Sequence, residues 1–186
     1  MSISDDLDRR FREAAASLEL LDVAYDVVDS EIGPLLAAVT DRGLACLSFD
    51  PEPGERLESL AAFAGPRILR TSRRLDLVRH ELDEYFAGRR TMFDLSLDLR
   101  GLPPFTVSVL AELAKVPYGR TATYRDLAER VGKPSASRAV GTVMNRNRIP
   151  IVLPCHRIVG SSGSLVGYAG GLELKERLLR LEGAML

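Results

Sequence analysis

The chain has no tryptophan, only two histidines and only two cysteines among its 186 residues. The two cysteines, Cys46 and Cys155, could form at most one disulfide, and a reducing compartment favours free thiols. Neither a CxxC pair nor a His/Cys cluster supplies the spacing of a metal site. We therefore expect no metal and no other cofactor.

Long apolar runs are also missing. No stretch approaches the roughly 20 consecutive apolar residues that a membrane span needs. The first eight residues, Met-Ser-Ile-Ser-Asp-Asp-Leu-Asp, lack the basic and then apolar order of a signal peptide. We expect a cytoplasmic protein that does not bind membranes.

The net charge of −1 hides an uneven distribution of charge along the chain. Residues 1–100 carry 13 Lys and Arg against 20 Asp and Glu, whereas residues 101–186 carry 12 against 6. Between Lys115 and Arg157 the ratio is nine to two. A basic half of this kind is typical of a surface that binds a polyanion, but it is equally typical of a plain solvated face. Charge alone does not decide between them.

The first half alternates strand and helix patterns, which predicts an α+β domain. A charged helix is expected over residues 5–21. Strands are predicted at 23–28, 35–39, 44–49, 68–70 and 93–99, and helices at about 55–64 and 73–87. We expect an amino-terminal extension at 1–21 and an α+β domain at 22–100.

The linker 101–104, Gly-Leu-Pro-Pro, begins a mainly helical domain that we place at 101–186. Helices are predicted at 105–115, at about 124–131 with Thr123 as N-cap, at 135–145 and at 173–182. Two helices joined by a glycine-containing turn, with small residues on the second, match a helix-turn-helix of winged-helix-like character.

An apolar run at 151–153 leads into Pro154-Cys-His-Arg157. A cysteine becomes a nucleophile only as a thiolate, so it needs a nearby base or cation. His156 is adjacent, and Glu182 could orient its imidazole. Since neighbours in an extended chain point to opposite faces, a water could carry the proton between Cys155 and His156. The alternative is a buried, inert thiol.

Five glycines follow within the twelve residues 160–171. Such a loop lets a planar ligand approach the backbone closely, although turn glycines in a surface loop give the same pattern. Together with Pro154-Cys-His-Arg157, Lys175 and Glu182, this segment resembles the signature of the O6-alkylguanine-DNA alkyltransferases. Upstream motifs resemble the same family: Val116-Pro-Tyr-Gly119, Thr123-Tyr-Arg-Asp-Leu-Ala128 and Arg138-Ala-Val-Gly141.

The resemblance implies a one-shot repair protein that flips O6-alkylguanine out of double-stranded DNA, with O4-alkylthymine as a further candidate, and transfers the alkyl group irreversibly to Cys155. His156, through water, and Glu182 would relay the proton. Asn147 would hold the turn before the active site. Tyr124 would crowd the target's phosphate or protonate guanine N3.

The same resemblance implies the substrate and DNA contacts. Arg138 would fill the hole left in the base stack, while Ala136 and Ala139 would allow close approach to the minor groove. The carbonyls of Cys155 and Ile158 and the N–H of Ala169 would read the guanine edge. The remaining expected substrate or DNA contacts are Arg148, Arg157 and Tyr168.

Some positions depart from the family pattern. Arg148 stands where proline is usual, and residues 1–21 lie outside the resemblance. Two other functions remain as alternatives: a lesion-binding module without chemistry, which Cys155 argues against, and a thiol hydrolase, which would turn over repeatedly. We expect a monomer in solution and leave cooperative assembly on DNA open.

Overall fold

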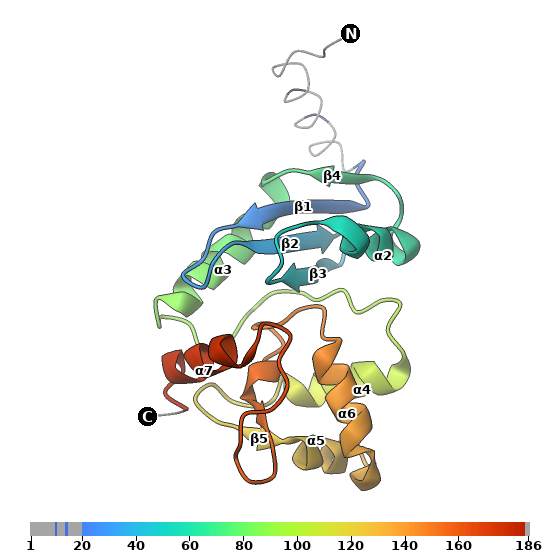
Figure 1. Ribbon diagram of the computed structural model, residues 1–186. Coiled ribbons are helices and arrows are strands. Elements are labelled where there is room, and N and C mark those ends of the chain that lie inside the picture. The colour runs from blue at the N-terminus through green and yellow to red at the C-terminus, as the bar shows by residue number, and fades with distance from the viewer. Residues whose placement is uncertain (1–9, 11–13, 15–19, 185–186) are drawn as a thin grey trace. The chain divides into compact units, whose positions relative to one another are not determined.

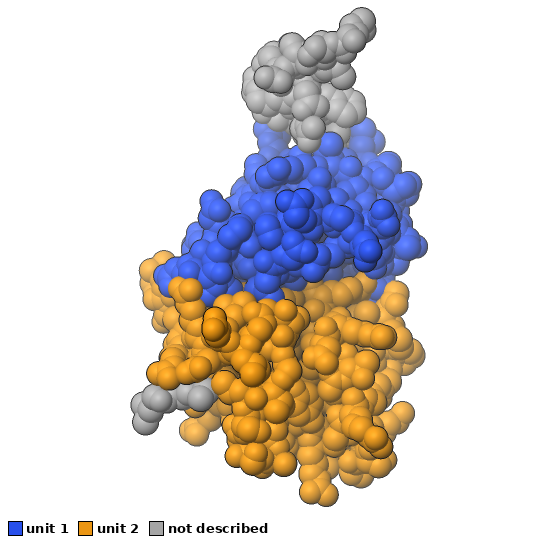
Figure 2. Space-filling model, in the orientation of Figure 1, with its two compact units in different colours: residues 1–84, 94–100 blue, residues 85–93, 101–186 orange. Residues whose placement is uncertain are grey.

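The computed structural model describes residues 10, 14 and 20–184. The chain divides into two compact units, residues 1–84 with 94–100, and residues 85–93 with 101–186 (Figure 2). The helix predicted at 5–21 lies almost entirely outside the described residues. Within the described part, no helix is both long and apolar enough to cross a membrane.

Unit 1 is built on a four-stranded sheet with the order β3-β2-β1-β4 (Figure 1). The strands are β1 (Val23–Val28), β2 (Leu35–Thr40), β3 (Gly43–Ser48) and β4 (Ile68–Arg70). β2 pairs antiparallel with β1 and β3, whereas β4 pairs parallel with β1. Every residue of β2 is buried, as expected of a central strand covered on both faces.

Helices cover both faces of this sheet (Figure 1). Leu60 of α2 (Gly54–Ala64) packs into an apolar cluster with Val23, Ala38 and Cys46. On α3 (Asp76–Phe86), which follows a short 3-10 helix at Arg73–Leu75, Val78 and Leu82 are buried. The sheet and both helices confirm the predicted α+β fold of the first half.

The strand predicted at residues 93–99 is wrong. In place of a strand, this segment forms a single parallel backbone bridge with the sheet, between Leu97 and Leu44. The Leu44 N–H donates to the Ser96 carbonyl and the Asp98 N–H to the Leu44 carbonyl, both at 2.8 Å. The alternation of polar residues suggested that Asp98 faces solvent, but its side chain turns inward and is 1% exposed.

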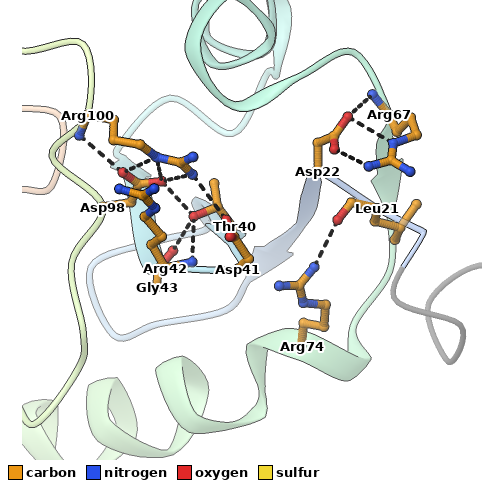
Figure 3. A network of polar contacts seen from close by, with 10 residues as sticks. All are labelled: Leu21, Asp22, Thr40, Asp41, Arg42, Gly43, Arg67, Arg74, Asp98 and Arg100. Carbon is orange, nitrogen blue, oxygen red and sulfur yellow. Dashed lines mark hydrogen bonds and ion pairs between the residues drawn. The ribbon is translucent and has the colours of Figure 1, made fainter.

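Asp98 anchors this segment to unit 1 through charge-assisted hydrogen bonds (Figure 3). Its carboxylate accepts from the Thr40 hydroxyl at 2.6 Å and from Nε of Arg100 at 2.9 Å. Burial by itself would raise the pKa of Asp98, but these hydrogen bonds outweigh it and hold the pKa at about 2. The ionised carboxylate therefore fastens the end of unit 1 to its sheet.

Unit 2 contains four helices in its described part, α4 (Pro104–Leu113), α5 (Tyr124–Arg130), α6 (Ser137–Asn145) and α7 (Leu172–Leu181). Thr123 caps α5 as predicted, in a capping box with Asp126. A short 3-10 helix at Pro134–Ala136 leads from α5 into α6, completing the helix-turn-helix. A two-stranded parallel sheet, β5 (Ala122–Thr123) and β6 (Ile158–Val159), was not predicted.

Unit 2 also includes residues 85–93, which the sequence placed with the first half. The boundary between the units therefore falls inside α3, between Glu84 and Tyr85. We propose that the first domain ends at residue 100 and that residues 85–93 belong to the second domain.

Replacing Asp98 by Asn should lower the free energy of unfolding by about 1–3 kcal/mol at neutral pH, because two partners lose a charged acceptor. Since the carboxyl pKa falls from 3.8 to about 2 on folding, its contribution is present above pH 3.8 and is lost as the pH falls towards 2. Urea titrations at several pH values measure the effect.

The control is Asp50→Asn, because Asp50 forms an exposed ion pair with Arg56. Its loss should cost less than about 1 kcal/mol. Equal losses for the two variants would contradict the anchoring role of Asp98.

Candidate active site

A compact turn, rather than an extended strand, delivers Cys155 to its site. Residues 149–153 form turns and bends, and Cys155–Arg157 is a 3-10 helix. Asn147 holds this turn: its Oδ1 accepts from the Ile149 N–H at 3.0 Å and its Nδ2 donates to the Leu153 carbonyl at 2.8 Å. Asn147 therefore links the beginning and the end of this turn.

The backbone of this turn is strained at Ile151. Among the described residues other than glycine, Ile151 alone has a positive φ, 72°. The left-handed region is costly for a β-branched side chain, and it persists only where packing enforces it. Ile151 is fully buried. The turn is thus held in one conformation by the apolar core beneath it.

The thiol of Cys155 is buried, with the residue 4% exposed. Its Sγ accepts a hydrogen bond from Asn147 Nδ2 at 3.2 Å. Burial raises the pKa of the thiol to about 11, although the Asn147 hydrogen bond and the charge of Lys175 oppose the rise. At neutral pH the resting group is the thiol, so its use as a nucleophile requires a base.

His156 offers a candidate base. The imidazole is fully buried, and its Nε2 lies 2.8 Å from Glu182 Oε1. Burial lowers the pKa of His156 against the opposing pull of Glu182, which favours the neutral imidazole. Among the described residues, Nδ1 is buried without a hydrogen bond within the protein. This nitrogen can take a proton, directly or through a water.

Glu182, at the end of α7, is the centre of a buried polar cluster. It accepts from His156, from Tyr85 Oη at 2.7 Å and from Arg157 through Nε at 2.8 Å and Nη2 at 2.9 Å. Burial would raise the pKa of Glu182, but the hydrogen bonds from His156 and Arg157 hold it at about 2. The carboxylate is ionised and acts only as an acceptor.

A tight turn at Gly119 closes over Glu182. The Gly119 N–H points at Glu182 Oε2 at 3.4 Å. Gly119 has a φ of +71°, and a Cβ at this position would lie 2.8 Å from the Glu182 carbonyl oxygen. The approach therefore requires glycine.

Arg157 is not a surface residue, which corrects the expectation that it contacts DNA. It is 5% exposed, and its guanidinium pairs with Glu182 through two nitrogens while Nη1 donates to the Val116 carbonyl at 2.6 Å. The guanidinium also lies 5.8 Å from the centre of the Tyr118 ring. Arg157 compensates the buried charge of Glu182.

Lys175 is a second buried cation beside the thiol. Its Nζ donates to the carbonyls of Ile158 at 2.5 Å and Val166 at 2.8 Å. Burial lowers the pKa of Lys175 to about 8, and the opposing effect of Cys155 belongs to its ionised form. Lys175 thus ties the active-site strand to the glycine-rich loop, and it already engages the Ile158 carbonyl that was expected to read guanine.

Two tyrosines flank the thiol. The hydroxyl of Tyr124 donates to the Val166 carbonyl at 3.4 Å. The ring of Tyr168 meets that of His156 edge-on, with 6.4 Å between their centres. Burial and then the nearby Cys155 raise the pKa of both phenols, so both are protonated donors. Ala169, next along the loop, is exposed.

The outer face of α6 carries exposed polar and small side chains. Arg138 and Ala139 are exposed, as is Arg146 just after the helix, while Val140 and Val143 are buried beneath them. Ala136 lies in the preceding 3-10 helix and is half-buried. Arg148 is also half-buried. Of these predicted DNA contacts, Arg138 and Ala139 are exposed on α6, whereas Ala136 and Arg148 are half-buried.

Sequence reasoning missed Tyr85 and the contacts of Lys175. A lysine on the buried face of α7, three and four residues before Leu178 and Leu179, was a usable signal. Tyr85 lies 97 residues from its partner Glu182, and no sequence pattern indicated that contact. Among the described residues, no three His, Cys, Asp or Glu side chains are placed to hold a metal ion.

Comparison with known families accounts for most of the chain. Residues 23–99 match the family described as 6-O-methylguanine DNA methyltransferase, ribonuclease-like domain. Residues 104–184 match the family described as 6-O-methylguanine DNA methyltransferase, DNA binding domain.

Relatives and solved structures agree with these matches. The chain is 43% identical over 159 residues to the methylated-DNA–protein-cysteine methyltransferase of Methanosarcina barkeri, covering 85% of this chain and 96% of the relative. It is 42% identical to the protein of that name from Mycolicibacterium paratuberculosis, covering 86% and 92%. The crystal structure of Mycobacterium tuberculosis OGT in complex with DNA aligns with a TM-score of 0.76 and 37% identity, covering 87% and 93%.

The buried thiol gives a direct test of the site. In a Cys46→Ser background, the rate of Cys155 modification by iodoacetamide should rise about tenfold per pH unit between about pH 7 and pH 10, because only the thiolate reacts. Peptide mass spectrometry of quenched samples measures the rate. A plateau below about pH 8 would contradict a thiol whose pKa is raised to about 11.

Proposed function

The chain belongs to the 6-O-methylguanine DNA methyltransferase family, and we propose that it repairs alkylated guanine in DNA by accepting the alkyl group on its own Cys155. The observation that carries the assignment of the acceptor is the buried cluster of Cys155, His156 and Glu182. Cys155 precedes His156 in the 3-10 helix, both residues are buried, and an ionised carboxylate holds the imidazole at 2.8 Å. A buried thiol with a neutral imidazole within reach of one bridging water is an arrangement that can activate a nucleophile.

The reaction is a displacement at the alkyl carbon. The thiol proton passes to His156 Nδ1, through a water, and Glu182 stabilises the resulting imidazolium. A bond forms between Cys155 Sγ and the alkyl carbon as the bond from that carbon to guanine O6 breaks. Guanine leaves with a proton that the Tyr124 hydroxyl donates, and the proton on the His156 imidazolium returns through water to Tyr124. Thiol and O6-alkylguanine thus become thioether and guanine with no net change of charge, and no group in the site can reverse the thioether.

Tyr124 and the glycine-rich loop would form the walls of the base pocket. Because the pKa of Tyr124 is raised, its hydroxyl holds a proton that it can donate to guanine N3. Its present contact, the Val166 carbonyl at 3.4 Å, is long and readily exchanged. Tyr168 and the exposed residue Ala169, whose N–H would read the guanine edge, lie along the same loop.

DNA is the partner, and α6 is the element proposed to enter its minor groove. Exposed Arg138 would occupy the position of the flipped base, and the small side chains of Ala136 and Ala139 would allow the helix to lie close to the groove. Arg148 would meet the phosphate backbone. The nine basic residues between Lys115 and Arg157 support this orientation, although Arg157 itself serves the buried cluster.

O6-alkylguanine is the proposed lesion, and O4-alkylthymine is a further candidate. Every group of the proposed relay lies within unit 2 of one chain. A monomer therefore suffices for the chemistry, and we propose that the protein acts as one.

Incubation with duplex DNA containing O6-methylguanine should add one methyl group per protein molecule, on the peptide that contains Cys155. Cys155→Ser should abolish transfer and retain binding to the lesion, because only the nucleophile changes. Intact-protein and peptide mass spectrometry measure both outcomes.

Cys46→Ser is the matched control and should transfer normally, since Cys46 lies in the apolar cluster of unit 1. Methyl transfer to Cys46, or many turnovers per molecule, would rule out the proposal.

Arg138→Ala should slow repair of duplex DNA by at least about tenfold while leaving the reaction with free O6-benzylguanine nearly unchanged. The free base needs no extrusion from the stack, which costs a few kcal/mol in DNA. Quenched-flow measurements on the two substrates separate extrusion from chemistry.

Arg180→Ala serves as the control, because Arg180 is exposed and its guanidinium pairs with Glu176 one turn away on α7. Equal losses on both substrates for Arg138→Ala would mean that Arg138 supports the pocket or the fold.

A further inference from the structure

Tyr85 brings a hydroxyl to the proposed relay from the last turn of α3. The residue is fully buried, and its Oη donates to Glu182 Oε1 at 2.7 Å. Its ring is fixed by three aromatic neighbours, with ring centres 5.2 Å from Phe86, 5.3 Å from Phe93 and 6.1 Å from Tyr118. The hydroxyl therefore has a defined position against the carboxylate.

Glu182 Oε1 is a crowded acceptor. Besides Tyr85, it accepts from His156 Nε2 at 2.8 Å and from Arg157 Nη2 at 2.9 Å. An ionised carboxylate has no proton to give, so His156 Nε2 must be the donor in this pair. The tautomer of His156 is then set: Nε2 carries the hydrogen, and Nδ1 keeps the lone pair.

We propose that Tyr85 is a positioning residue for alkyl transfer, whose hydroxyl shares Glu182 Oε1 with His156 and thereby limits how strongly the carboxylate draws the imidazole proton. This inference rests on the function proposed above. Tyr85 touches neither substrate nor thiol, and it acts through Glu182.

The hydrogen bond from Tyr85 has two consequences for His156. By drawing electron density from Oε1, it keeps the carboxylate from becoming a stronger proton acceptor. The Nε2 proton then stays on the imidazole when a second proton arrives at Nδ1 from Cys155. By fixing Oε1 in place, it also fixes the ring and directs Nδ1. Tyr85 itself keeps its proton, because burial raises the pKa of its phenol.

The other charged and titratable groups around the pair are few. Glu182 faces His156 and Arg157 from the 3-10 helix, Tyr85 from α3 and Tyr118 from the turn after α4. His156 faces Glu182, Arg157 and Lys175, and also the ring of Tyr168 on the glycine-rich loop. Removing the Tyr85 hydroxyl leaves the charges of Arg157 and Lys175 unchanged, so the effect on His156 passes through Glu182.

The test compares Tyr85→Phe with Tyr118→Phe in the full chain. Tyr118 is a matched control, because its hydroxyl donates to the Leu181 carbonyl at 3.0 Å and its ring, which the variant keeps, faces Arg157. The reaction with free O6-benzylguanine is followed by mass spectrometry from about pH 5 to pH 9, and each time course gives a rate constant and a final labelled fraction.

Tyr85→Phe should lower the rate constant at pH 7 about tenfold, as expected for losing a hydrogen bond to a charged group. The acid limb of its pH profile should move up by roughly half a pH unit or more, because a more basic carboxylate raises the pKa of His156. Tyr118→Phe should leave the profile in place. The final labelled fraction counts folded molecules, so a purely structural loss would lower that fraction and not the rate constant.

A second comparison uses Glu182→Gln. If Tyr85 acts through the carboxylate, adding Tyr85→Phe to Glu182→Gln should cause little further loss of rate, whereas independent effects would multiply. Multiplying losses, an unmoved pH profile for Tyr85→Phe, or an equal shift in Tyr118→Phe would each overturn the inference. Failure of the wild-type chain to label Cys155 would instead reject the proposed function.

Discussion

The buried carboxylate of Glu182 is the constraint on which unit 2 depends. An isolated charge in an apolar interior costs many kcal/mol, so the fold must surround it with donors. Arg157 supplies the compensating charge, while Tyr85, His156 and the Gly119 N–H supply the remaining hydrogen bonds. These groups come from α3, from the turn after α4 and from the 3-10 helix that contains the nucleophile. A single charge thus joins four segments of the chain.

The burial of this cluster also bears on the reactivity of Cys155, which is low at rest and is proposed to rise when substrate is bound. Burial keeps Cys155 protonated and protects it from oxidants and from other electrophiles in solution. Glu182 meanwhile fixes the imidazole that is proposed to remove the proton once an alkylated base lies beside the thiol. For a protein that can react only once, a low resting reactivity preserves the nucleophile for its substrate.

Much of the architecture follows from local sequence signals. Strands 23–28 and 68–70, the Thr123 cap and the helices of unit 2 were predicted because periodicity and capping are properties of neighbouring residues. The motif around Cys155 likewise predicts a nucleophile with a neighbouring base, and these roles remain proposals. The failures have a common cause: Asp98 faces Thr40, Arg157 faces Glu182 and Tyr85 faces Glu182, and each contact joins residues far apart in sequence. From sequence alone, polar residues of this kind are expected at the surface, because the partner that allows their burial is distant in the chain.

The boundary between the two units falls within α3, so one continuous helix contributes residues to both units. Hydrogen bonds in a helix link each residue to one four positions away, so the turn that holds Tyr85 is bonded to the turn before it in unit 1. Fraying of the amino-terminal half would pass along these bonds and withdraw a hydroxyl from Glu182. We therefore expect that loss of structure in the first half weakens the hydrogen bond between Tyr85 and Glu182, and that a fragment beginning at residue 101 keeps Cys155 but lacks Tyr85.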